Sequence, residues 1–294
     1  MEKHWRLILS ESRGAAFNMA VDEAILRTCT DGEVPPTLRL YGWEKPSVSL
    51  GYSQDIERIQ IDVQYCRDAG VELVRRLTGG RAVLHGHDLT FSVAVQKHDI
   101  QEGFGDVRRS HLWLMGGVRA GLRTLGINAE IGSSGERSLG AATSADCFAH
   151  IAECDIRAGT SKLVGSAQVR RWGGILEQGS IPHLVPPTDY QQVFAKANSH
   201  WRPDRSFPSG VSRQTIEEAI VQGFEQTLEV DFEVGTLTDR EIGLAFELER
   251  NKYASPDWTY RRHSIYVDKR MQGCYTDNVN LRGGRHHAEE NPGR

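Results

Sequence analysis

The chain has 294 residues, 39% of them hydrophobic and 25% charged, and its formal net charge at pH 7 is −4. This length and composition predict a globular protein with one large hydrophobic core rather than two equal domains. The negative charge excludes a general attraction to phosphate backbones, and no basic run compensates for it. We therefore expect no nucleic-acid partner.

The N-terminal segment and the cysteines indicate the compartment. The opening MEKHWRLILSESRG lacks the apolar run of a secretion signal, and no later segment reaches the ~18 apolar residues of a membrane span. We therefore expect a cytoplasmic protein with no membrane partner. The cysteines show no Cys-x-x-Cys spacing, which argues against a disulfide framework or a zinc ribbon and predicts free thiols. They are Cys29, Cys66, Cys147, Cys154 and Cys274.

The first predicted element is a helix over 15–29. Its apolar residues recur at helical spacing, and Asp22 and Glu23 fall on the opposite, polar side. Two strands, 35–43 and 47–53, follow with period-two alternation. A proline-containing break separates them, which predicts that they are antiparallel neighbours in one sheet.

A second helix is expected over 55–70, where Gly70 is a natural C-cap. Next come three strands (71–77, 82–85 and 89–96), a long helix (106–125), short strands within 127–181, and two helices (212–229 and 237–253). The later residues lack periodicity, and we expect 254–294 to be a poorly ordered extension. The pattern predicts an α/β (α+β) domain over 1–253, with a mixed, largely antiparallel sheet flanked by helices.

The polar motif RRLTGGRAVLHGHDLTFS begins at Arg75. Its paired glycines let backbone N–H groups approach a ligand, and Arg75, Arg76 and Arg81 could meet an anionic group. The same pattern is equally typical of a glycine turn with solvated arginines, and it is neither a P-loop nor a dinucleotide fingerprint. His85 and His87 fall on one face of a strand, but no third ligand follows at a recognisable spacing. We expect no metal.

Cys147 and Lys162 are the candidate reactive pair. A free thiol is mostly protonated at neutral pH, so a catalytic cysteine needs a neighbouring cation or base. The ammonium of Lys162 could stabilise a Cys147 thiolate. Its neutral amine could instead pass protons, for which the lysine pKa would have to fall from about 10.4 toward 7. From the residues alone, a buried cysteine and a surface lysine explain the same pattern.

Several of these stretches, taken in order, resemble the lipoate and biotin protein ligase superfamily. Within it they resemble the cysteine-dependent protein octanoyltransferases. The matching blocks cover about residues 15 to 181 and are AFNMAVDEAIL, PPTLRLYGW, SLGYSQ, RRLTGGRAVLHGHDLTFSV, CF, KLVGSAQVRR and ILEQGSI. The resemblance implies a catalytic domain like that of the class II biotin/lipoyl ligases, and an acyltransferase that needs no cofactor.

The resemblance also implies a reaction. In that family the cysteine takes an octanoyl group from octanoyl-acyl carrier protein as a thioester and passes it to a lysine of a lipoyl domain or glycine cleavage H protein. Cys147 matches this nucleophile, and Lys162 matches the lysine that stabilises its thiolate. The residues implied to line the acyl tunnel or bind substrate are Arg75, Arg76, Thr78, Gly79, Gly80, Arg81, His85, Gly165, Ser166 and Ala167.

Two departures from the family pattern bear on the function. After CF the chain reads AHIAECDIRAGTS where these transferases more often resemble SPSWYELVVEGR, which leaves the acyl donor open. The ATP-using lipoate ligases of the superfamily carry a third glycine and an Asn-Asp pair. This chain has Arg81 at the first place and Asp146-Cys147 at the second, which favours thioester chemistry over adenylation.

Three functions remain open. The first is a cysteine octanoyltransferase, or an amidotransferase that moves octanoyl between lipoyl domains. The second is an ATP-dependent lipoate ligase, and the third is a non-catalytic carrier-binding module. We also expect a monomer, in which Arg170 and Arg171 either contact an acidic carrier protein or are solvated.

Overall fold

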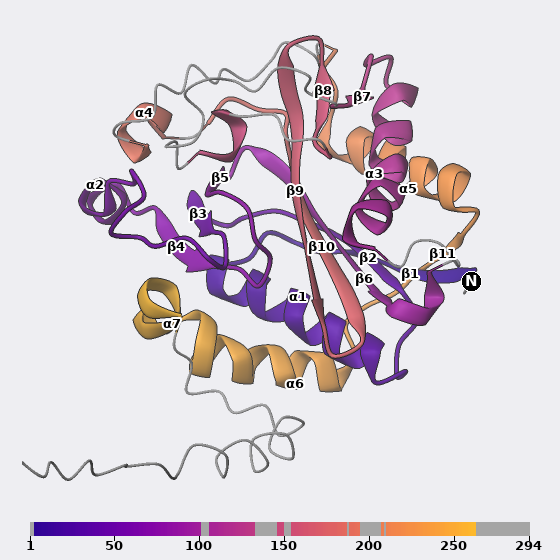
Figure 1. Ribbon diagram of the computed structural model, residues 1–294, viewed down its shortest axis with the longest axis horizontal. Coiled ribbons are helices and arrows are strands. Elements are labelled where there is room, and N and C mark those ends of the chain that lie inside the picture. Colours follow the sequence, from indigo (N-terminus) through magenta and orange to yellow (C-terminus); the bar gives the residue numbers. More distant parts are fainter. Residues whose placement is uncertain are drawn as a thin grey trace, which may run out of the picture.

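In the computed structural model of the protein, the described residues are 3–100, 106–132, 146–149, 154–186, 188–194, 207–208 and 210–262. They form a large sheet with helices on both faces and a small sheet at one end (Figure 1). The large sheet has the strand order β11-β1-β2-β6-β10-β9-β8-β7. The bounds are β1 (His4–Leu9), β2 (Thr37–Tyr41), β6 (Asp88–Gln96), β7 (Glu130–Ile131), β8 (Ile156–Ala158), β9 (Ser161–Arg171), β10 (Gly174–Pro182) and β11 (Asp231–Val234).

Pairing in the large sheet is mixed. β1 is parallel to β2 and β11, and the other described pairs are antiparallel, so the predicted mixed, largely antiparallel sheet is confirmed. The prediction of short strands within 127–181 is wrong for the second half of that segment. There β9 and β10 have 11 and 9 residues and form one long hairpin. Trp172 and Gly173 both have positive φ in the connecting turn, which matches the twist of a two-residue hairpin.

A second, three-stranded sheet has the order β4-β3-β5, with β3 at Ser47–Leu50, β4 at Glu72–Arg75 and β5 at Val83–His85. The prediction that the strands at 35–43 and 47–53 are antiparallel neighbours is therefore wrong, because β2 and β3 belong to different sheets. Val48 and Leu50 pack with residues of α2 (Val63–Asp68) and α4 (Tyr190–Val193), in a cluster separate from the main core.

The helix expected over 55–70 is also shorter than predicted, because only α2 is helical. Asp62 caps it by accepting a hydrogen bond from the Tyr65 N–H at 2.8 Å. The preceding residues form turns that bury Ile56 and Ile61 against the small sheet. Gly70 has φ +68 just beyond the helix, so the predicted end is confirmed.

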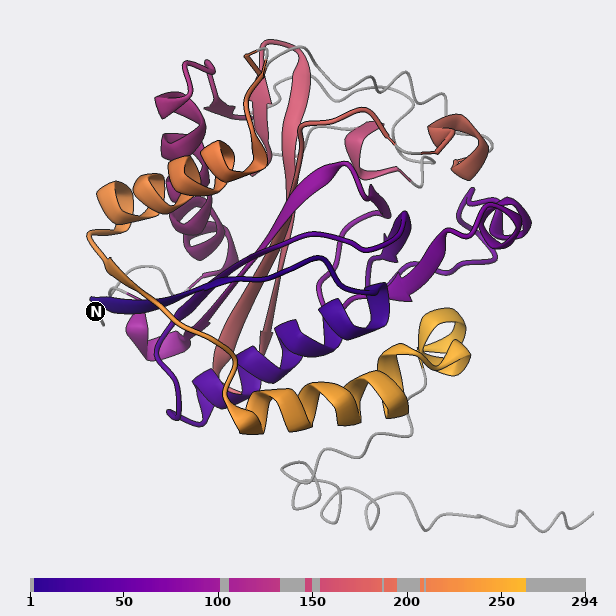
Figure 2. The same cartoon turned by 180° about the vertical axis from the view of Figure 1, so that it is seen from behind.

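The remaining helices cover the two faces of the large sheet. On one face lie α3 (Val107–Thr124) and α5 (Arg213–Leu228), against the apolar side of the central strands. On the other face lies α1 (Ala15–Thr30), covered in turn by α6 (Asp239–Leu248), its π-helical continuation Glu249–Tyr253 and α7 (Pro256–Arg261) (Figure 2). The long helices were predicted within a few residues.

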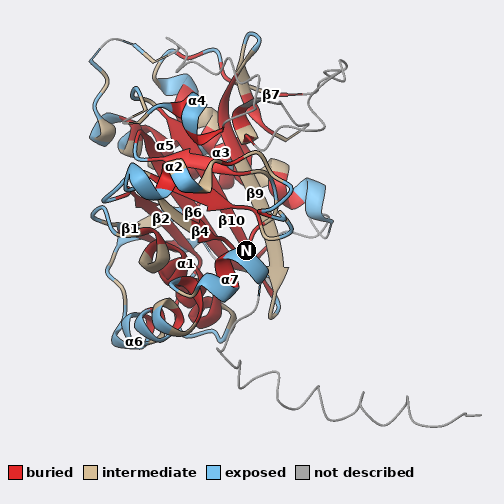
Figure 3. Ribbon diagram, turned by 90° about the vertical axis from the view of Figure 1, so that its left-hand side faces the viewer, coloured by how far each residue is buried: buried red, intermediate tan, exposed pale blue. Residues whose placement is uncertain are grey.

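Burial corrects the prediction for α1. Its whole length is enclosed, and the expected polar side is inside (Figure 3). Asp22 is fully buried and accepts hydrogen bonds from Arg39, Tyr41, Ser92 and Gln178 at 2.6–2.9 Å. Buried carboxylates persist only when such partners replace the lost water.

Glu23 is the second buried carboxylate of α1. It pairs with Arg27 and with Lys252, the latter at 2.7 Å, and accepts from the Tyr253 hydroxyl at 2.5 Å. Burial alone would raise its pKa, but Lys252 and Arg27 outweigh burial and lower the pKa of Glu23 to about 2. On the polar side of α1, Glu23 therefore contacts the residues after α6 and Asp22 contacts the large sheet, and neither faces solvent.

The first residues of the expected C-terminal extension pack against the domain. Trp258 in α7 is buried, and its indole N–H donates to the carbonyl of Arg75 at 2.9 Å. Arg75 Nε donates back to the carbonyls of Trp258 and Thr259. Residues 263–294 lie outside the described part of the chain. Among the helices that are described, none is long and apolar enough to cross a membrane.

Candidate active site

Cys147 is the first residue of a one-turn 3-10 helix, Cys147–Ala149. The preceding residue, Asp146, forms a β-bridge with Ala82, next to the small sheet. The Cys147 N–H donates to the carbonyl of Ala82 at 2.9 Å. Asp146 is fully buried and accepts from the Phe148 N–H at 2.8 Å and from the Tyr190 hydroxyl. These bonds hold the thiol at the start of β5.

Lys162, on β9, lies against this thiol. Its Nζ is 3.3 Å from Cys147 Sγ and 3.1 Å from the Cys147 carbonyl oxygen. The same nitrogen forms a buried ion pair with Asp155, at 2.7 Å from Oδ2. The structure therefore brings together the two residues that the sequence singled out, and it adds a carboxylate.

Cys147 and Asp155 together set the charge of the amine. Burial lowers the pKa of Lys162, but Cys147 and Asp155 together outweigh burial, so the pKa is raised from its ordinary value. The hypothesis that this pKa falls toward 7 and lets the neutral amine pass protons is wrong. With its pKa raised, Lys162 acts on the thiol as an ammonium, by its charge.

Sequence reasoning missed Asp155, and no local signal identified it. It precedes β8, which pairs with β9 through an irregular register between Ile156 and Arg157. That register places Arg157 opposite Lys162 and leaves the Asp155 carboxylate facing the Lys162 amine. Only the pairing of two strands could reveal the contact.

Gly165 lets β9 run close to the thiol. A Cβ at this position would lie 3.1 Å from Cys147 Sγ and 3.1 Å from Lys162 Cε. Such distances are tighter than ordinary contacts, so any side chain would push against both reactive groups. The expectation that Gly165 belongs to the site has a specific geometric reason here.

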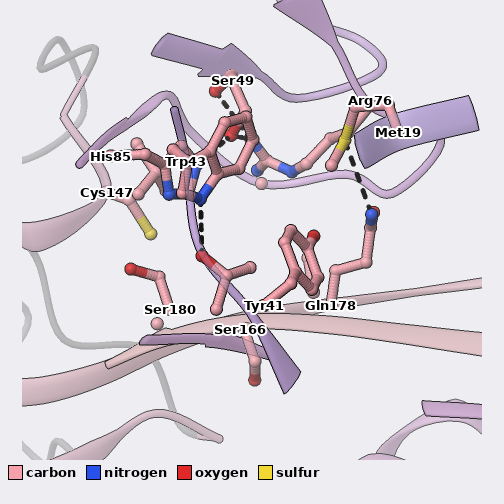
Figure 4. A pocket seen from close by; sticks show the side chains of 16 residues that line it. Met19, Tyr41, Trp43, Ser49, Arg76, His85, Cys147, Ser166, Gln178 and Ser180 are labelled. Atoms are coloured by element: carbon pink, nitrogen blue, oxygen red, sulfur yellow. Dashed lines mark hydrogen bonds between the residues drawn. The ribbon is translucent and has the colours of Figure 1, made fainter. Parts of the chain in front are cut away.

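A pocket with an empty volume of about 400 Å³ opens beside the thiol. Cys147 and Met19 lie at opposite ends of it in Figure 4, with Trp43, Arg76 and Tyr41 between them. The described residues that line it are Met19, Tyr41, Trp43, Ser49, Arg76, Gly80, Val83, His85, Thr90, Cys147, Gly165, Ser166, Ala167, Gln178, Gly179 and Ser180.

Arg76 holds the glycine turn from inside. Its guanidinium donates to the Thr78 hydroxyl at 3.1 Å and to the carbonyls of Ser49, Gly79 and Arg81 at 2.6–2.8 Å. A guanidinium has five N–H donors, and Arg76 commits them to the protein. We therefore assign Arg76 to shaping the pocket wall and not to binding an anionic substrate.

The other predicted residues of this motif divide into two groups. His85 and Gly80 line the pocket, as do Ser166 and Ala167 on β9, whereas Arg75, Thr78, Gly79 and Arg81 do not. Arg75 donates to the carbonyls of Gly51, Tyr52 and Gln54 as well as to α7, which makes it a structural tie. Thr78 donates to Gln178, whose side chain reaches the pocket from β10.

Both ring nitrogens of His85 have protein partners. Nε2 is 2.8 Å from the Ser49 hydroxyl, and Nδ1 is 2.8 Å from Asp88 Oδ2. The ring stacks on Trp43 with centroids 4.0 Å apart. Burial lowers the pKa of His87 to about 4. Within the part of the chain that the structure describes, no group of three potential metal ligands is found.

The arginines at the tip of the β9–β10 hairpin also contact the protein. Arg170 donates to the Asp106 carbonyl at 2.7 Å and to the Ser110 hydroxyl at 2.8 Å. The Arg171 guanidinium lies 5.2 Å from the centre of the Tyr52 ring. Arg170 is therefore not simply solvated, and contact of this pair with an acidic carrier protein stays a prediction.

The fold and the site are those of an α/β protein with a thiol and a fixed ammonium at one end of a pocket. The chain matches the lipoyl protein ligase A/B catalytic domain over residues 14–225, and it belongs to that family. The resemblance inferred from the sequence blocks is therefore confirmed.

Its curated relatives include proteins named octanoyltransferase LipM. The one from Moorella thermoacetica is 39% identical over 271 residues, covering 88% of this chain and 98% of that protein. The one from Kyrpidia tusciae is 38% identical over 275 residues, covering 88% and 99%.

Solved structures with the same fold are lipoate ligases. Lipoate-protein ligase A bound with ATP is 30% identical, with a TM-score of 0.69, and covers 88% of this chain and 99% of its own. A bi-partite lipoate protein ligase from Thermoplasma acidophilum, studied with its E2 lipoyl domain, is also 30% identical at a TM-score of 0.69. It covers 91% of this chain and 100% of its own.

Proposed function

We propose that this protein is an octanoyltransferase of lipoate biosynthesis that works through a thioester on Cys147. The observation that carries the proposal is the Lys162 ammonium 3.3 Å from the Cys147 sulfur, at one end of the pocket. The relatives named octanoyltransferase support the acyl group and the reaction class. The reaction has two half-reactions that share one sulfur atom.

In the first half-reaction the Cys147 thiolate attacks the carbonyl carbon of an octanoyl thioester. The donor is octanoyl-acyl carrier protein. A new C–S bond forms, and the donor thiol leaves with its electron pair. Lys162 favours the reactive anion because it remains charged, which is how a neighbouring cation activates a cysteine.

The pocket holds the chain while the donor leaves. Burying a methylene is worth about 0.8 kcal/mol, so burying the octanoyl tail contributes on the order of 5 kcal/mol. Trp43 and Met19 provide apolar surface for it, and Met19 limits the depth at the far end (Figure 4). The pocket therefore favours one range of chain lengths.

In the second half-reaction the ε-amine of a lysine attacks the thioester and forms an amide. The acceptor is a lipoyl domain or glycine cleavage H protein. The C–S bond breaks, and the sulfur leaves as the anion that Lys162 stabilises. The relationship to a ligase studied with its E2 lipoyl domain supports an acceptor of this kind.

ATP-dependent lipoate ligation is the second candidate. It is favoured by the likeness to lipoate-protein ligase A bound with ATP. In that reaction Lys162 would contact an acyl-adenylate, and Cys147 would have no role. The close contact between Cys147 and Lys162 has no purpose in this scheme, and we therefore prefer the thioester.

The test weighs the intact protein after incubation with octanoyl-acyl carrier protein. A hydroxylamine-labile octanoyl adduct is expected on the wild type and on Cys154→Ala, a matched control at another half-buried cysteine, but not on Cys147→Ala. Acyl transfer that requires ATP and survives Cys147→Ser supports the ligase. An adduct formed only from an octanoylated lipoyl domain supports an amidotransferase. Carrier binding without any transfer supports a non-catalytic module.

A further inference from the structure

Ser49, His85 and Asp88 form a buried hydrogen-bonded chain at the pocket wall. The Ser49 hydroxyl is 2.8 Å from His85 Nε2, and His85 Nδ1 is 2.8 Å from Asp88 Oδ2. Ser49 and His85 line the same pocket as Cys147 (Figure 4). Asp88 also accepts from the hydroxyls of Thr90 and Ser180, which fix its orientation.

The proton positions follow from the charge of Asp88. Burial would raise its pKa, but His85 and the hydrogen bond from Ser180 help to hold that pKa well below the usual range. An ionised carboxylate can only accept, so the proton of a neutral His85 ring lies on Nδ1 and Nε2 has a free lone pair. In that neutral form of the ring, the Ser49 hydroxyl donates to Nε2.

Amide formation from a lysine requires a base, and Lys162 is not one. Cys147 and Asp155 together raise the pKa of Lys162, and its buried ion pair with Asp155 at 2.7 Å does not depend on the thiol. Burial lowers the pKa of Arg76 only to about 10, which leaves it a cation near neutral pH. Burial and Asp22 raise the pKa of Tyr41 well above 10. Among the described residues that line the pocket, His85 carries the one imidazole, the side chain that most often serves as a general base.

We propose that the Ser49, His85 and Asp88 chain removes the proton from the attacking lysine in the second half-reaction. This inference rests on the proposed function and adds a proton path to it. Ser49 contacts the amine, His85 takes the proton through Ser49, and Asp88 positions His85. Arg76 Nη1, 3.1 Å from the Ser49 hydroxyl oxygen, stabilises the negative charge that develops there.

The step balances as follows in atoms and charge. The lysine arrives with one proton already lost to water, and its nitrogen bonds to the thioester carbon. As the C–S bond breaks, one N–H proton passes to Ser49 Oγ while the Ser49 hydroxyl proton passes to His85 Nε2. The electron pair leaves on Cys147 Sγ beside the Lys162 ammonium. His85 later returns its proton to water.

A purely structural role is the competing explanation. Ser49 and His85 belong to the small sheet through β3 and β5, whereas Asp88 belongs to the large sheet through β6. The chain could therefore simply brace one sheet against the other. Loss of a brace would slow every step at the pocket, whereas loss of a base slows only the step that needs proton removal.

The experiment uses the full chain with octanoyl-acyl carrier protein and a lipoyl domain, and it follows the octanoyl adduct on Cys147 by mass in single turnovers. Variants are Ser49→Ala and His85→Gln. The control is His183→Gln, a half-buried histidine at the end of β10 outside the pocket lining. Each acyl-enzyme is then mixed with the lipoyl domain or with hydroxylamine. The intermediate formed by hydroxylamine is acidic enough to lose its proton to water, so this reaction needs no base from the protein.

Both variants are expected to form the adduct and to react with hydroxylamine within about threefold of wild type. Transfer to the lipoyl domain should fall about 10²- to 10⁴-fold, the usual contribution of a general base, and stay normal in the control. Equal slowing of all steps, or normal transfer, overturns the inference. If His85→Gln does not fold, Ser49→Ala decides by itself. Absence of any adduct on the wild type overturns the proposed function instead, and this inference with it.

Discussion

Asp155→Asn tests whether a buried carboxylate keeps Lys162 charged beside the thiol. The substitution keeps the shape of the side chain and removes its charge, 2.7 Å from Nζ. Removing one partner of a buried ion pair usually costs about 3–5 kcal/mol of folding stability. We expect that loss in urea unfolding at pH 7.

Asp155→Asn should also lower the thiolate population of Cys147. Two unit charges 3.3 Å apart interact by on the order of 5 kcal/mol at an effective dielectric constant of about 20. Without Asp155 the burial of Lys162 favours its neutral form, and part of this attraction is lost. Losing even about 1.4 kcal/mol of it lowers the thiolate population tenfold. Alkylation of Cys147 by iodoacetamide at pH 7 should therefore slow at least tenfold.

The pH dependence has a definite sign. The pKa of Lys162 is raised by folding, so its contribution to stability is present below the ordinary lysine value near 10.5 and is lost as the pH rises through the folded value. In Asp155→Asn this alkaline loss should begin at lower pH.

The matched control is Glu130→Gln, which breaks a partly exposed pair with Arg157 at 2.8 Å on the neighbouring strands. Exposed pairs contribute about 0–1 kcal/mol, so this variant should stay within that range and alkylate normally. The reasoning is refuted if Asp155→Asn matches this control in both the unfolding free energy and the alkylation rate.

Three further predictions concern packing and charge. Gly165→Ala should lower the free energy of unfolding by about 1–3 kcal/mol, because the added methyl group crowds Cys147 and Lys162. The octanoyl adduct on Cys147 should also form more slowly at temperatures where the variant remains folded. Normal adduct formation would contradict the tight approach. Glu23→Gln should lower the free energy of unfolding by about 3 kcal/mol above pH 5. The pKa of Glu23 is lowered from 4.5 to about 2, so its stabilising contribution is lost as the pH falls through that window. An acid-unfolding midpoint identical to wild type argues against this prediction. Trp258→Ala should cost about 3–5 kcal/mol in thermal unfolding, and Tyr260→Ala, half-exposed on the same helix, should cost under 1 kcal/mol; equal losses would mean that α7 does not anchor to β4.

Periodicity was a good guide to most helices and to the central strands. α3, α5 and α6 follow apolar spacing that a helix turns into one buried face, and this is a property of neighbouring residues. The pattern was misleading where tertiary contacts supply what the local sequence lacks. The polar side of α1 was expected in solvent because residues 15–29 contain no sign of its distant partners. Lys252 and Tyr253 cover Glu23, and residues of the large sheet cover Asp22.

Strand pairing was the weakest part of the prediction. β2 and β3 are adjacent in sequence and alternate in the same way, yet they join different sheets. Alternation shows that a segment is extended and which side chains share a face, but it does not say which partner supplies the hydrogen bonds. The choice depends on apolar clusters assembled from distant segments, as for β3 with α2 and α4.

The sequence by itself determined the family, the mixed sheet and the two residues that meet at the site, because ordered blocks of residues carry that information along the chain. Only the tertiary structure decided that the pKa of Lys162 is raised, that Arg75 and Arg76 donate to the protein itself, and that Ser49 lies beside His85. Each of these depends on an acid, a carbonyl or a hydroxyl brought from another strand or helix. Charge and proton position respond to distances of a few ångströms in space, which spacing along a chain does not encode.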